Sequence, residues 1–179
     1  KNIPVAEIVF SRGLISLIVT SLQIRREGIQ PWGKKKHLLI IRGLLGTLAL
    51  YCVFRALGNL PISTATLIQY TYPTFIVLGA YYFLKEKPSK IIWLAIILGW
   101  IGICTIIQPS WEGNINFKFS LVEILFALSG AILTSLAYLC VKNLSRTENP
   151  LIIIFYFPLI SVLLTIPFLF IDFVIPSLL

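Results

Sequence analysis

Long apolar stretches recur along the whole chain and alternate with short polar segments. A helix needs about 20 mostly apolar residues to cross the hydrocarbon core of a bilayer. Pro, Gly, Asn and charged residues gather between the stretches, as is typical of loops. The pattern therefore predicts an all-α polytopic membrane protein with six transmembrane helices. We place these helices at residues 3–24, 38–58, 62–84, 91–107, 120–141 and 150–171.

The composition excludes a water-soluble globule. Of the 179 residues, 58% are hydrophobic and 12% are charged, so lipid must supply part of the solvent. The three cysteines fall inside apolar stretches, where small buried side chains are a better interpretation than disulfide partners; they are Cys52, Cys104 and Cys140.

Most of the basic residues lie in alternate loops, on one predicted side of the membrane. The 15 Lys and Arg residues exceed the 7 Asp and Glu residues, which gives a net charge of +8. Basic residues in short loops mark the cytoplasmic side of a membrane protein. Only Lys1 and Lys118 lie in segments on the other side, so the excess favours the lipid bilayer, not nucleic acid, as a partner. The basic residues of the first, third and fifth loops are Arg25, Arg26, Lys34, Lys35, Lys36, Lys85, Lys87, Lys90, Lys142 and Arg146.

The stretch at residues 62–84 has a polar first half and an apolar second half. Pro73 lies at its centre, where it removes a backbone donor and tends to kink the helix. Interruptions of this kind near the midplane form binding sites in transporters, so we expect Thr66, Gln69, Tyr70 and Pro73 to bind substrate. Thr66 and Tyr70 share one helix face and Gln69 lies on another, and which face is wet is left open. The alternative is a kinked helix whose hydroxyls bond to its own backbone or to neighbouring helices.

Ionisable side chains inside hydrocarbon are functional candidates because they need a partner or water. Arg12 lies near the middle of the first stretch, and we expect it to bind anionic or carboxylate groups of a substrate; structural pairing with another helix is the alternative. Glu7, Arg55 and Glu123 lie at similar depths near the outer ends of their stretches. We predict that they form an ion-pair cluster for gating or coupling, unless each reaches the interface separately. Arg42 is interpreted as an interfacial anchor.

Small residues recur at helical spacing, which predicts where helices approach closely. The same spacing suits helices that slide past one another in a transporter. These residues are Gly43 and Gly46 in the second stretch, Ala95, Gly99 and Gly102 in the fourth, and Ala127, Ala131, Thr134 and Ser135 in the fifth.

Several motifs occur in an order and spacing shared with a known family. They are Glu7-x-x-Phe10-x-Arg12, Arg42-Gly43-x-x-Gly46, Ala56-Leu57 before Leu60-Pro61-x-Ser63-x-Ala65, then Pro73, Glu86, Gly99, Gly102 and Pro109. On these motifs the chain resembles the EamA branch of the drug/metabolite transporter superfamily, especially members similar to the S-adenosylmethionine carriers. The resemblance implies a ten-helix fold of two inverted five-helix repeats around a central cavity. The chain then looks like helices two to seven: residues 1–109 hold four helices of the first repeat, without its first helix, and residues 110–179 hold the first two of the second.

The leading hypothesis is a secondary transporter that moves a small metabolite by alternating access. A non-transporting membrane scaffold or receptor is the alternative. An intramembrane enzyme is disfavoured because the sequence has a single histidine, no His-Glu-x-x-His helix, no Gly-x-Ser-x-Gly elbow and no metal-ligand cluster. We therefore expect no catalytic residues, no metal and no cofactor. The expected partners are a small-molecule solute and the lipid of the plasma (inner) membrane, with a homodimer and the coupling ion left open.

Overall fold

The computed structural model describes residues 5–107 and 121–172, and every regular element in these ranges is an α-helix. The helices match the six predicted spans with ends shifted by a few residues, except that two helices share the span at residues 62–84. The predicted repeat boundary at residues 109–110 lies outside the described residues, as do Lys1, Pro109 and Lys118. The helices are α1 (Val5–Arg26), α2 (Lys36–Asn59), α3 (Ile62–Gln69), α4 (Tyr72–Leu84), α5 (Lys90–Ile107), α7 (Leu121–Leu144) and α8 (Pro150–Asp172).

The described helices are those of an all-α, multi-pass membrane protein. Four segments are individually long and apolar enough to cross a membrane, and α5 contributes a shorter apolar segment, Lys90–Gly102. Large apolar side chains such as Ile15 of α1 and Ile91 of α5 remain exposed, which suits contact with hydrocarbon. The four long segments are Glu7–Arg26, Lys36–Asn59, Leu121–Leu144 and Pro150–Pro167.

The third predicted span is interrupted at Tyr70 and Thr71, between α3 and α4. Pro73 has no backbone N–H, so the carbonyl of Gln69 cannot receive the helical hydrogen bond from four residues ahead. The N–H of Tyr70 donates to the carbonyl of Thr66 at 2.9 Å and closes α3. Pro73 then stands in the first turn of α4, where a missing donor costs no helical bond. The predicted kink is confirmed as a break just before the proline.

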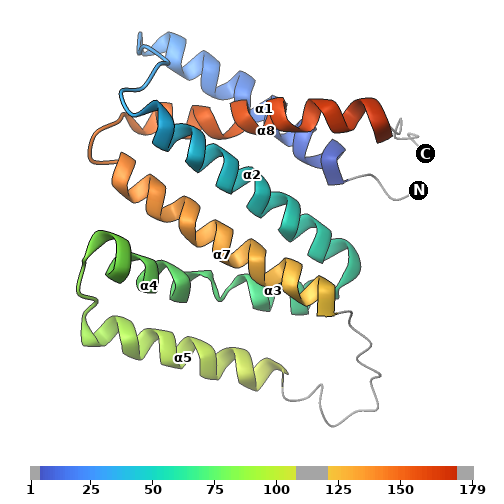
Figure 1. Cartoon of the computed structure of the whole chain (residues 1–179), viewed down its shortest axis with the longest axis vertical. Helices are drawn as coiled ribbons and strands as arrows, with labels where there is room; N and C mark the ends of the chain where they lie inside the picture. The colour runs from blue at the N-terminus through green and yellow to red at the C-terminus, as the bar shows by residue number, and fades with distance from the viewer. Residues whose placement is uncertain (1–4, 108–120, 173–179) are drawn as a thin grey trace.

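The α2–α7 pair forms the centre of the molecule (Figure 1). On one side α8 packs against α2 and α1 packs against α8; on the other side α3 and α4 follow one another along α7, with α5 beyond them. Small residues permit these contacts: a side chain at Gly43 would strike Ile160 of α8, and one at Gly130 would come within 3.0 Å of Val53 of α2. The predicted close approaches in the second and fifth stretches are therefore confirmed, since Gly43, Gly46, Ala127, Ala131 and Ser135 are all buried.

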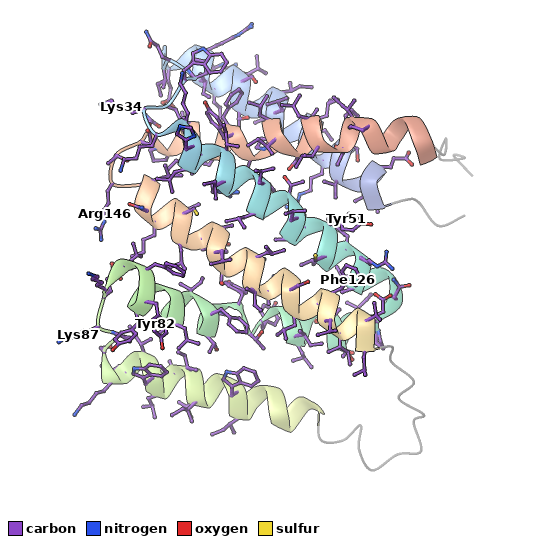
Figure 2. The ribbon with its side chains drawn as sticks, in the orientation of Figure 1. Lys34, Tyr51, Tyr82, Lys87, Phe126 and Arg146 are labelled. Atoms are coloured by element: carbon purple, nitrogen blue, oxygen red, sulfur yellow. The ribbon has the colours of Figure 1, made fainter. Side chains whose placement is uncertain are left out.

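The loops predicted to be cytoplasmic lie along one edge of the molecule. Figure 2 shows Lys34, Lys87 and Arg146, from three different loops, on this edge. The prediction that basic loops share one side is thus confirmed. We call this side the cytoplasmic edge, following the positive-inside rule, and the opposite side the outer edge.

Candidate functional site

A cavity of about 270 Å³ lies between α2, α3, α7 and α8. We call it the α2/α7 cavity. Its polar side chains come from three different helices, and the rest of its lining is apolar or small. A few polar groups on a largely apolar wall are typical of a small-molecule site. The polar residues are Arg42 of α2, Gln69 of α3, and Thr134 and Tyr138 of α7; among the other lining residues are Gly46, Leu50, Val53, Ala137 and Phe157.

Gln69 ends α3, directly before the break, and its side chain enters the α2/α7 cavity. Its Nε2 donates a hydrogen bond to Oγ1 of Thr134 at 3.1 Å. Its Oε1 is buried and has no hydrogen-bond partner. An unpaired buried acceptor is costly, so Gln69 has one polar atom available for a ligand.

Arg42 also lines this cavity, although the sequence was interpreted as placing it at the membrane interface. Its guanidinium lies 4.8 Å from the ring centroid of Phe157, within the range of a cation–π contact. Its Nε and Nη1 are buried without hydrogen-bond partners. The spacing to Gly46, one helical turn later, is the sequence signal that points to this role, because both residues lie on the same face of α2.

A second cavity of about 280 Å³ separates α4 from α5. We call it the α4/α5 cavity. Tyr70 and Pro73 line it together with Thr74, whose Oγ1 accepts a hydrogen bond from Nε1 of Trp100 at 3.1 Å. The facing wall from α5 includes Ala95 and is otherwise largely apolar. Unlike the α2/α7 cavity, which Arg42 lines, this cavity has no charged side chain in its lining.

The structure divides the predicted substrate-binding residues among several places. Gln69 lines the α2/α7 cavity, whereas Tyr70 and Pro73 line the α4/α5 cavity. The hydroxyl of Thr66 donates to backbone carbonyls of its own helix, at 2.7 and 2.9 Å. Arg12 is exposed on α1 and lines neither cavity.

Two of the three charged residues predicted to form an outer cluster come together. Nη2 of Arg55 lies 3.9 Å from Oε1 of Glu123, and the Arg55 guanidinium lies 4.6 Å from the ring centroid of Phe126. This ion pair joins α2 to α7 near the outer edge. Glu7 forms no ion pair with a described residue, and its Oε2 is buried without a hydrogen-bond partner.

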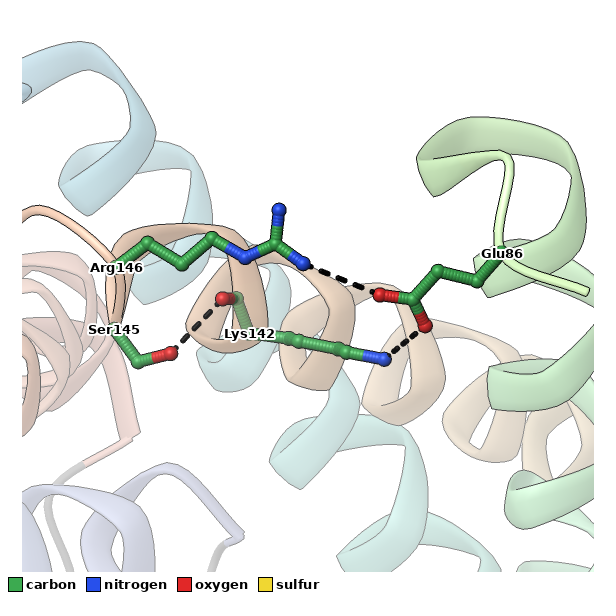
Figure 3. A network of polar contacts seen from close by, with 4 residues as sticks. All are labelled: Glu86, Lys142, Ser145 and Arg146. Atoms are coloured by element: carbon green, nitrogen blue, oxygen red, sulfur yellow. Dashed lines mark hydrogen bonds and ion pairs between the residues drawn. The ribbon is translucent and has the colours of Figure 1, made fainter.

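A second charged contact, which sequence reasoning missed, lies at the cytoplasmic edge. Figure 3 shows Glu86, from the turn after α4, opposite Lys142 of α7 and Arg146 of the turn that follows α7. Lys142 donates to Oε2 of Glu86, and Nη2 of Arg146 lies 3.3 Å from Oε1. Lys85, in the left-handed conformation (φ 53°), ends α4 directly before this glutamate. We call this contact the Glu86 bridge.

Together the fold and the cavities define a polytopic helical membrane protein with a cavity between its central helices that is lined by a few polar groups. Within residues 5–107 and 121–172, no group of three or more His, Cys, Asp or Glu side chains is placed to hold a metal ion. The profile of the EamA-like transporter family matches residues 1–108. The chain therefore belongs to the EamA-like transporter family.

Curated relatives of the chain carry transporter names. The pseudopaline exporter CntI of Pseudomonas aeruginosa is 29% identical over 177 residues, covering 98% of this chain and 60% of the exporter. An uncharacterized transporter of Helicobacter pylori is 29% identical over 159 residues, covering 89% of this chain and 51% of that protein. The S-adenosylmethionine uptake transporter of Rickettsia bellii is 27% identical over 128 residues, covering 72% of this chain and 42% of that protein.

The chain thus spans 60% or less of the length of these three relatives. No solved structure matches it. The family model and the names of these relatives are those of transporters.

Proposed function

We propose that the protein is a secondary transporter that moves a small metabolite across a membrane by alternating access. The observation that carries the proposal is the α2/α7 cavity, in which Oε1 of Gln69 and two nitrogens of Arg42 are buried without partners. Unpaired polar groups inside a membrane protein are costly, and a polar solute would supply their partners. The family and the names of the relatives support transport as the activity.

The position of the α2/α7 cavity suits a carrier. The cavity lies between α2 and α3, in the predicted first repeat, and α7 and α8, in the predicted second repeat. Rocking of one repeat against the other would open such a cavity to one side and close it to the other. Gln69 is the predicted binding residue that this geometry supports best. Tyr70 and Pro73 would act through the break beside it, and for Arg12 and Thr66 binding stays a prediction.

Gating is proposed for the charged contacts at the two edges. The Arg55–Glu123 pair and the Glu86 bridge each join the predicted first repeat to α7 of the predicted second. Alternating access requires that contacts at the two edges open in turn. Glu7 is proposed for ion coupling, because its carboxylate group is partly buried and has no partner for Oε2.

The proposed location is the plasma (inner) membrane. The basic residues along the cytoplasmic edge would face the anionic leaflet of such a membrane. The proposed partners are the lipid and a small-molecule solute, and the homodimer stays a prediction.

Flux in sealed vesicles tests the proposed function. The purified protein is reconstituted in proteoliposomes, and a metabolite panel is screened for uptake against protein-free vesicles. We expect accumulation of a chemically unchanged solute. The rate should fall about 5- to 10-fold in Gln69→Ala, because a hydrogen bond to the solute is lost. Gln30→Ala, at an exposed loop glutamine, is the matched control and should keep the rate.

Two outcomes would contradict the proposed function. Formation of a product would indicate an intramembrane enzyme. Neither flux nor chemistry for any solute would indicate a scaffold or receptor.

A further inference from the structure

We propose that the α2/α7 cavity recognises a solute that carries both a carboxylate and an N–H donor, with Arg42 binding the carboxylate and Gln69 accepting from the N–H group. This inference rests on the proposed function and names the chemical class of its solute.

The charge of Arg42 has no counter-ion among the described residues. No acidic side chain lines the α2/α7 cavity. Glu86 and Glu123 form ion pairs with other cations, and Glu148 accepts a backbone hydrogen bond at the cytoplasmic edge. A partly buried guanidinium without a counter-charge is costly, and an anion in the cavity offsets that cost.

The guanidinium of Arg42 is held at the wall of the cavity by its neighbours. Phe157 covers its face, and Gly46 leaves room for Nη1, since a Cβ at Gly46 would lie 2.7 Å from that atom. Nε and Nη1 are buried without hydrogen-bond partners, so the guanidinium has donors to offer to a group that enters the cavity. A carboxylate oxygen can accept a charge-assisted hydrogen bond from the guanidinium, which is stronger than a bond between neutral groups.

Gln69 defines the second group of the solute. Because Nε2 donates to Thr134, the amide is oriented with Oε1 as the free acceptor. An acceptor of this kind needs an N–H or O–H donor, and an amine or amide on the solute supplies it. The lining from α2 runs from Arg42 to Val53, a length of about 16 Å at 1.5 Å per residue. A solute with an apolar body between its two polar groups suits these walls.

Ligand-induced thermal stabilisation of the purified protein in nanodiscs of neutral lipid tests this inference. The probes are γ-aminobutyrate, δ-aminovalerate and ε-aminocaproate, in which apolar chains of increasing length separate the carboxylate from the amine. Each is compared with its carboxamide, which lacks the carboxylate, and with its deaminated acid, which lacks the amine. We expect an amino acid to bind about 10- to 100-fold more tightly than its carboxamide, with the deaminated acid in between.

Four substitutions separate the two contacts. Arg42→Gln should weaken amino-acid binding about 10- to 100-fold and remove the preference for the acid over the carboxamide. Arg42→Lys keeps the charge and should recover part of that preference. Gly46→Ala keeps Arg42 but would displace its guanidinium and the Phe157 ring that covers it, so it should weaken binding without removing a charge. Gln69→Leu should remove only the preference for the amino acid over the deaminated acid.

Arg26→Gln, at an exposed arginine that ends α1, is the matched control and should bind as the unaltered protein does. Equal binding of acids and carboxamides, or no stabilisation by any carboxylate, would overturn the inference. A further arm adds phosphatidylglycerol: if this lipid replaces the solutes and its effect is lost in Arg42→Gln, Arg42 holds a headgroup and the inference fails.

The flux measurement distinguishes a failure of the proposed solute class from a failure of the proposed transport function. Transport of a solute without a carboxylate, at a rate unchanged by Arg42→Gln, would overturn the solute class and leave the carrier standing. Absence of flux for every solute would overturn the carrier itself.

Discussion

Glu148, in the loop that precedes α8, forms a hydrogen bond with the start of α2. Its Oε1 accepts a hydrogen bond from the N–H of Lys35 at 2.6 Å, at the N-cap of α2, where no local side chain caps the helix. The side chain is buried, and its negative charge lies at the positive end of the helix dipole. Gly33 leaves it space, since a Cβ there would lie 3.0 Å from Oε2. One carboxylate thus joins two loops at the cytoplasmic edge.

Replacing Glu148 with alanine should destabilise the protein by about 1–3 kcal/mol, because the N–H of Lys35 loses its acceptor. Glu148→Gln keeps an acceptor oxygen and should lose less. The midpoint of thermal unfolding in detergent measures both. Glu27→Ala, at an exposed loop glutamate, should stay within about 0.5 kcal/mol. If Glu148→Ala costs no more than this control, the contact contributes nothing to stability.

At the residue scale, the sequence could identify polar side chains that are costly to bury without a partner, but it could not identify their partners. Gln69 stands out because an amide inside an apolar stretch needs a partner wherever it points. Arg42 could not be assigned to a cavity, because its contact with Phe157 joins α2 to a helix far along the chain. The partner of Glu148 lies 113 positions away, beyond the reach of any local pattern.

At the element scale, the α3–α4 break gives the two faces of the polar segment different surroundings. Gln69 lines the α2/α7 cavity, and Tyr70 lines the α4/α5 cavity. Helical spacing alone could separate these faces, and Pro73 made an interruption predictable. Which neighbour each face meets depends on α5 and α7, whose positions the local sequence does not encode.

Pro73→Ala tests whether the break is needed for transport. Alanine restores an N–H that can donate to the carbonyl of Gln69, so α3 could continue into α4. We expect stability to change by less than about 1 kcal/mol. Flux should fall about tenfold, because a continuous helix would resist the bending that alternating access asks of this segment. Flux in proteoliposomes and thermal unfolding are measured side by side.

Pro88→Ala, in the loop before α5, is the matched control and should keep both the rate and the stability. Equal flux in the two variants would show that transport does not depend on the break between α3 and α4.

At the scale of the whole molecule, hydropathy and charge were enough to predict where the helices lie along the chain and that the basic loops share one edge. The apolar stretches are long enough to dictate helices, and the alternating basic loops dictate which ends lie together. The order of packing was not predictable in the same way. It depends on matches such as Gly43 against Ile160, which no property of a single stretch reveals.

The two edges of the molecule carry opposed charged contacts, which together make a prediction about access to the α2/α7 cavity. The Arg55–Glu123 pair lies at the outer edge, and the Glu86 bridge lies at the cytoplasmic edge. Partly exposed pairs contribute at most about 1 kcal/mol each. Losing one therefore changes stability little, but it can shift the balance between inward-open and outward-open states by up to about fivefold.

The rate at which a cysteine in the cavity wall is chemically modified from each side measures this balance. Ala137→Cys places a thiol at a buried position that lines the cavity, in a protein whose native cysteines are changed to serine. Glu86→Gln should speed its modification by a membrane-impermeant reagent from the cytoplasmic side, whereas Glu123→Gln should speed it from the outer side. Each variant is the control of the other, because both remove one negative charge. If both favour the same side, the two contacts are not opposing gates, and whatever drives alternating access must lie elsewhere in the structure.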